Sequence, residues 1–110
     1  MKVFEELGDV KPNLEIIATH VRHGQQRPNY ILRDVEKFST VLNKWEFEPK
    51  ADPLSRCGYD YQVVATNGET TINLSICFAC KTLVLNHQGK FSISPRQILK
   101  LFADDFNEVS

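Results

Sequence analysis

Short runs of alternating apolar and polar residues dominate the second half of the chain. Residues 59–66, "YDYQVVAT", and residues 70–79, "TTINLSICFA", show the alternation and the β-branched and aromatic content typical of strands. They flank Asn67-Gly68, a dipeptide that tolerates the positive φ angles of a tight hairpin turn. Residues 82–86 and 91–94 predict two more strands, so an antiparallel meander is expected.

The first half of the chain predicts a strand pair followed by a helix. Residues 14–21 and 28–34 have strand composition and are separated by a polar stretch that contains a glycine. Asp34 is placed to cap a helix whose apolar side chains recur at i, i+3, i+4 and i+7; these are Phe38, Val41, Leu42 and Trp45. Residues 46–58 contain two prolines and predict a surface loop.

A second helix is predicted at the end of the chain. Ser94 provides a cap, Pro95 occupies the first helical position, and Gln97 is placed to return the capping bond. Its apolar stripe consists of Ile98, Leu101, Phe102 and Phe106, and its acidic residues Asp104, Asp105 and Glu108 are expected to face water. Each predicted helix has a single apolar face. Together with the meander, these helices predict an α+β fold in which an antiparallel β-sheet packs against two helices as a two-layer sandwich. A length of 110 residues predicts one domain, residues 1–110.

Charge and composition narrow the function classes. Thirteen Lys and Arg residues against fourteen Asp and Glu residues give a formal charge of -1, which disfavours a nucleic acid or an anionic membrane as partner. No run approaches the ~18 apolar residues that a membrane span needs, and the first residues carry acids where a signal peptide has an apolar core. A cytoplasmic location and reduced thiols are therefore expected.

The candidate chemistry with the most defined spacing is "ICFACK", residues 76–81, which contains Cys77 and Cys80. In a regular strand these two side chains point to opposite faces, whereas a bulge near Ala79 to Lys81 would change the alternation. Pairing the hairpin tightly about Asn67-Gly68 places Gly58 opposite Cys77, which brings Cys57 within diagonal reach.

Three interpretations of these cysteines remain open. A zinc site would use Cys57, Cys77, Cys80 and His87, although the chain lacks a zinc-finger spacing. A thioredoxin-type redox pair is disfavoured because no helix is predicted after Cys80. Buried cysteines that act as small hydrophobes need neither a metal nor any other cofactor, and this is the expected state.

The segment from Cys57 through the final helix, residues 57–106, resembles a family of small, mostly uncharacterised bacterial proteins. The resemblance rests on a cysteine before a hairpin, on a Cys-Phe-x-Cys signature at the end of the second strand, and on a helix after "FSISP". It implies that Cys57, Cys77, Phe78 and Cys80 belong to one structural unit, and it implies no activity.

The region 20–33 is basic and offers a second candidate site. It contains His20, Arg22, His23, Arg27 and Arg33, with Tyr30 as a stacking surface, and it predicts either an RNA-contacting loop or a solvated hairpin tip. His20 and His23 are also an acid/base candidate, but no motif that defines a reaction accompanies them. A non-enzymatic protein is expected.

Acidic residues suggest a protein partner. Glu46 and Glu48 follow the first helix, and Asp104, Asp105 and Glu108 belong to the last; together they offer a negative surface to a basic protein, or simply a solvated one. Small size and the lack of a catalytic motif favour a bacterial immunity protein, an inhibitor that occludes a cognate toxin in systems such as contact-dependent growth inhibition. The expected toxin is a basic nuclease.

Overall fold

The computed structural model describes residues 1–8, 13–21, 28–50, 58–86 and 89–109. Within these ranges the chain forms an eight-stranded antiparallel sheet in the order β3-β7-β6-β5-β4-β1-β2-β8. The strands are β1 (Glu15–His20), β2 (Pro28–Leu32), β3 (Glu48–Pro49), β4 (Tyr61–Thr66), β5 (Thr71–Cys77), β6 (Thr82–Leu85), β7 (Gly89–Ser92) and β8 (Asn107–Glu108). The predicted α+β class and meander are confirmed, with β4 to β7 as consecutive neighbours.

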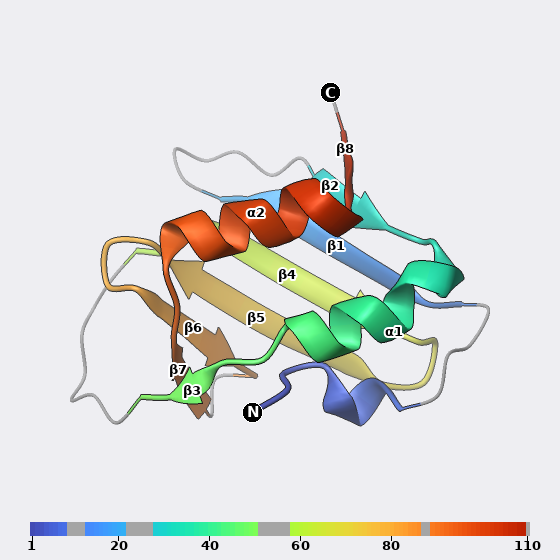
Figure 1. Cartoon of the computed structure of the whole chain (residues 1–110), viewed down its shortest axis with the longest axis horizontal. Coiled ribbons are helices and arrows are strands. Elements are labelled where there is room, and N and C mark those ends of the chain that lie inside the picture. The colour runs from blue at the N-terminus through green and yellow to red at the C-terminus, as the bar shows by residue number, and fades with distance from the viewer. Residues whose placement is uncertain (9–12, 22–27, 51–57, 87–88, 110) are drawn as a thin grey trace.

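Both helices lie on the same face of the sheet, so the molecule has two layers (Figure 1). Helix α1 spans Val35–Lys44 and helix α2 spans Pro95–Asp105; a short 3-10 helix, η1 (Glu5–Leu7), lies near the N-terminus. Both predicted N-cap residues are confirmed: Asp34 accepts a hydrogen bond from the N–H of Glu36, and Ser94 accepts one from the N–H of Gln97. The predicted return bond from the Gln97 side chain does not form with a described residue.

The core lies between the helices and the sheet. Side chains directly opposite one another in neighbouring strands, such as Ala18 and Val63, are fully buried on this face. Phe102 of α2 and Trp45 after α1 pack ring to ring at a centroid distance of 5.6 Å. On the opposite face Val64 is 39% exposed, in keeping with an antiparallel sheet that has one solvated side.

The N-terminal residues and a short edge strand were not predicted. Phe4 is fully buried against Trp45, at a ring distance of 5.2 Å, because the N-terminal segment runs beside the residues that follow α1. The predicted loop 46–58 begins with β3, which forms one edge of the sheet by pairing with β7. Such a short edge strand containing a proline resists edge-to-edge pairing with another chain.

The register predicted for the central hairpin is wrong by two residues. Thr66 lies opposite Thr71, so the loop has four residues rather than two, and Gly58 is not the residue opposite Cys77. The cause is the Asn67 side chain, whose Oδ1 accepts hydrogen bonds from the N–H groups of Glu69 and Thr70 while its Nδ2 donates to the carbonyl of Leu7. Gly68 supplies the positive φ of 93° that this loop requires.

Candidate functional site

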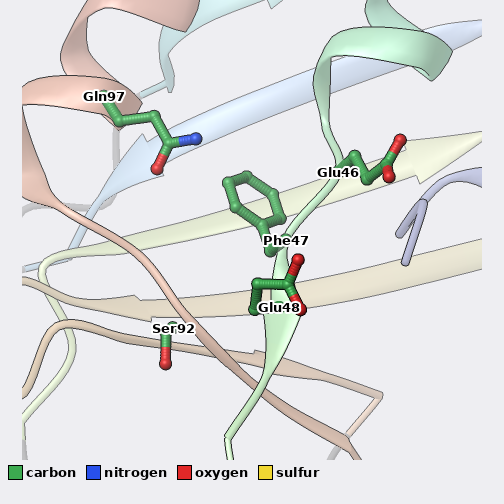
Figure 2. Close-up of a pocket in the computed structure, with 5 residues that line it drawn as sticks. All are labelled: Glu46, Phe47, Glu48, Ser92 and Gln97. Atoms are coloured by element: carbon green, nitrogen blue, oxygen red, sulfur yellow. The ribbon is translucent and has the colours of Figure 1, made fainter.

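A recess of about 310 Å³ lies between edge strand β3 and the first turn of helix α2. Its lining comprises Glu46, Phe47, Glu48, Ser92 and Gln97. Figure 2 shows the Gln97 amide extending from α2 toward the Phe47 ring, with the two glutamates on the side contributed by the segment after α1. The recess therefore combines two carboxylates with an amide, a hydroxyl group and an aromatic ring.

Local structure explains why these side chains meet. The extended segment 45–48 alternates, so Trp45 and Phe47 are buried and pack edge to face at 6.0 Å, while the glutamates point outward. Pairing of Glu48 with Ser92 brings this segment against β7. Because α2 begins three residues after Ser92, its first turn covers the same edge.

Both glutamates of the recess are exposed, and neither side-chain carboxylate makes an ion pair or a hydrogen bond with another described residue. The two cations at the N-terminus bond to acceptors other than these carboxylates. The ammonium group of Met1 donates to the carbonyl of Phe47 at 2.7 Å, and that of Lys2 donates to Oδ1 of Asn43 at 2.9 Å. Two carboxylates are therefore accessible to an incoming cation.

The acidic residues of the last helix have other roles. The prediction that Asp105 faces water is wrong: the residue is only 7% exposed, and its carboxylate accepts a hydrogen bond from Lys44 of α1 at 3.1 Å. Asp104 is exposed and pairs with Lys100 one turn earlier, and the hydrogen bond from Lys100 lowers the pKa of the Asp104 carboxyl. The prediction that Glu108 belongs to the last helix is wrong: α2 ends at Asp105, and Glu108 lies exposed on β8, the sheet edge opposite β3 and the recess.

The basic region is only partly described, because Arg22, His23 and Arg27 lie outside the described residues. Arg33 pairs with Glu15 at 2.6 Å, and the ring of His20 contacts Tyr61 edge to face at 5.0 Å. One face of Tyr30 is stacked on Phe102 at 4.7 Å. Within the described part of this region, therefore, these three side chains already contact other parts of the protein.

The cysteines differ from what the sequence predicted. Strand β5 ends at Cys77, and Cys80 lies in the turn before β6, so the pair does not occupy one regular strand. Cys80 is disulfide-bonded, which corrects the expectation of reduced thiols, whereas Cys77 is a buried free thiol. Cys57 and His87 of the hypothetical zinc set lie outside the described residues. Among the described residues no group of three or more metal-ligating side chains is present.

Gln97 and Ser92 were missed as recess residues. Gln97 was interpreted as a capping partner, and nothing in the local sequence indicates that β3 pairs with β7, which is what brings Ser92 to Glu48. The glutamates themselves were found from their charge.

Comparison with known proteins gives no match to a protein-family model, to a curated protein or to a solved structure. Among the described helices, none combines the length and apolar character required to cross a membrane.

Proposed function

We propose that this chain is a cytoplasmic, non-enzymatic protein-binding domain that inhibits a basic protein partner by occlusion, as an immunity protein inhibits its cognate toxin. The observation that carries the proposal is the recess at Glu46 and Glu48, where two exposed carboxylates lack a described ion-pair partner beside a buried ring and a side-chain amide. A partner lysine or arginine side chain fits this chemistry, because carboxylates accept its N–H groups and the amide oxygen of Gln97 adds an acceptor.

A nuclease is the toxin class that this surface favours. Proteins that bind nucleic acid carry clustered Lys and Arg for phosphate contacts, and an inhibitor that presents carboxylates to the same cluster competes for it. Complementary charge also raises the association rate and fixes the orientation of the complex. Asp104 and Glu108 are not part of this surface, because Asp104 lies in the last turn of α2 and Glu108 on β8, the sheet edge opposite β3, while Asp105 stabilises the helix pair.

The recess is tested first with a defined probe. N-acetyl-arginine amide is titrated into the isotopically labelled chain, with the neutral isostere N-acetyl-citrulline amide as the matched control. We expect saturable amide shift changes at Glu46, Glu48, Ser92 and Gln97 with the arginine probe, and none with citrulline. Equal responses to the two probes would contradict recognition of a cation.

The inhibitor function is tested with the full chain as bait in lysate of the source organism. A captured basic protein is identified, purified and assayed for cleavage of DNA and RNA with and without one equivalent of the chain. We expect Glu46→Gln combined with Glu48→Gln to weaken inhibition at least about tenfold, since each interfacial charge pair contributes on the order of 1 kcal/mol or more. The matched control, Glu36→Gln with Asp104→Asn, also removes two negative charges and should inhibit like the natural chain. An equal loss of inhibition in both double variants would show that net charge causes the effect, and would reject the recess as the binding site.

A further inference from the structure

The loop between β5 and β6 brings the two cysteines of "CFAC" close together. Cys77 pairs with Thr82 across a four-residue loop, Phe78 to Lys81, which is closed by a hydrogen bond from the N–H of Lys81 to the carbonyl of Phe78 at 3.2 Å. Lys81 has a φ of 53°, the left-handed conformation that reverses the chain. The N–H of Cys80 donates to Sγ of Cys77 at 3.3 Å. Because N and Cα are ~1.46 Å apart, the Cα atom of Cys80 lies within about 5 Å of that sulfur.

The two cysteines are in different oxidation states. Cys80 is disulfide-bonded, whereas Cys77 is a free thiol that is only 2% exposed. The Cys77 thiol therefore lies beside the residue whose disulfide it would attack, and rotation of the two side chains can bring the sulfur atoms together.

We propose that Cys77 and Cys80 form a thiol–disulfide exchange pair. The Cys77 thiol loses its proton, and the resulting thiolate attacks Sγ of Cys80. A Cys77–Cys80 bond forms as the bond between Cys80 and its present partner breaks. The partner sulfur leaves as a thiolate and takes up a proton, so one disulfide replaces another without an added oxidant or reductant.

The surroundings of the sulfur favour this step. The N–H of Cys80 points at Sγ of Cys77, the atom that carries the negative charge of the thiolate before it attacks. The ammonium group of Lys50 donates to the carbonyl of Cys80 at 3.2 Å and lies 3.5 Å from Oγ1 of Thr82, the residue opposite Cys77.

Asp60 fixes the start of the loop. Its carboxylate accepts a hydrogen bond from the N–H of Phe78 at 2.7 Å, and its own N–H donates to the carbonyl of Ile76. Cys77 is held between these two contacts while Cys80 lies within the turn. The nucleophile is therefore at a strand end that is held by two hydrogen bonds, and the sulfur that it attacks belongs to the turn.

The exchange does not depend on the proposed toxin inhibition. An exchanging disulfide is compatible with the proposed cytoplasmic location, because disulfides in that compartment are usually transient and catalytic or redox-sensing.

Disulfide mapping of the oxidised full chain tests the exchange. The chain is equilibrated at neutral pH without reductant, treated with N-ethylmaleimide, quenched in acid, digested and analysed by mass spectrometry. We expect two isomers, with Cys80 joined to Cys77 or to the third cysteine of the sequence, Cys57, and therefore maleimide on both Cys57 and Cys77. A single isomer, with maleimide confined to Cys77, would overturn the proposal.

Cys77→Ala is the control variant, because alanine keeps a small apolar side chain at a buried position. Without the attacking thiol, we expect a single isomer, with Cys80 joined to Cys57 and no maleimide on Cys57. Persistent labelling of Cys57 in this variant would also overturn the proposal, since the thiol would then arise without Cys77. If the variant does not fold, the map of the natural chain decides the question alone.

Discussion

Asp105→Asn should destabilise the protein although Asp104→Asn, one residue away, should not. Lys100 lies 2.7 Å from Asp104, closer than Lys44 lies to Asp105 at 3.1 Å, so distance alone predicts the opposite order. Burial reverses it. The Asp105 side chain is 9% exposed, whereas that of Asp104 is 39% exposed and that of Lys100 is 74% exposed, so water screens the shorter pair.

The expected loss of unfolding free energy in Asp105→Asn follows from the contact between Asp105 and Lys44. A hydrogen bond between charged groups contributes about 1.5–3 kcal/mol to stability. The Lys44 side chain is 40% exposed, which places the expected loss at the lower end, about 1–2 kcal/mol after screening. With a urea dependence of ~1.5 kcal/mol per molar, this corresponds to a midpoint lower by about 1 M.

Urea unfolding at neutral pH, followed through the fluorescence of Trp45, measures both variants. Trp45 is the only tryptophan of the chain and is fully buried, so its emission reports on the core. We expect the Asp105→Asn loss to persist at high salt, while Asp104→Asn stays at the natural midpoint. Equal losses in the two variants, or a loss for Asp105→Asn that salt abolishes, would refute the argument from burial.

Three further changes test other contacts. Asn67→Ala should cost about 2–3 kcal/mol in urea unfolding, because it removes the acceptor for two loop N–H groups and a buried donor to Leu7; a cost near zero would show that the loop forms without them. Burial raises the pKa of Tyr61, so the unfolded chain ionises first and stability should fall as pH rises past 10; Tyr61→Phe should flatten this decline, and an unchanged slope would contradict the assignment. A chelator should leave the melting temperature of the oxidised protein unchanged, because the disulfide withdraws the Cys80 thiolate from any zinc site; a lowered melting temperature would contradict this.

The helices and the strand composition were predictable because their signals are local. An apolar stripe such as Phe38 and Val41, preceded by a capping side chain, depends only on neighbours within a turn or two. Alternation in residues 61–66 likewise marks one buried face, and its inner positions Val63 and Ala65 are fully buried. The short strand β3 lacks such a signal, since its pairing with β7 depends on residues more than forty positions away.

The details of the candidate sites required tertiary contacts. The hairpin loop is longer than the Asn67-Gly68 dipeptide suggested because Asn67 also bonds to Leu7, sixty residues away, and this moves the register at Cys77 by two positions. Strand β5 also ends at Cys77, so "CFAC" comprises a strand end and a turn rather than part of one strand. Likewise, Asp105 is buried because Lys44 approaches from the other helix, which no helical periodicity can show.

The recess and the cysteine loop are joined by one short segment. Lys50 follows β3 two residues after Glu48; its N–H donates to the carbonyl of Lys90 at 2.9 Å, while its ammonium group bonds to the carbonyl of Cys80. A change in the backbone at Cys80 must therefore be accommodated at the end of the strand that carries the recess carboxylates. Because the two sites share this segment, the affinity of the recess for a cation has to be compared between samples whose disulfide state is fixed, and Cys77→Ala provides that fixed state.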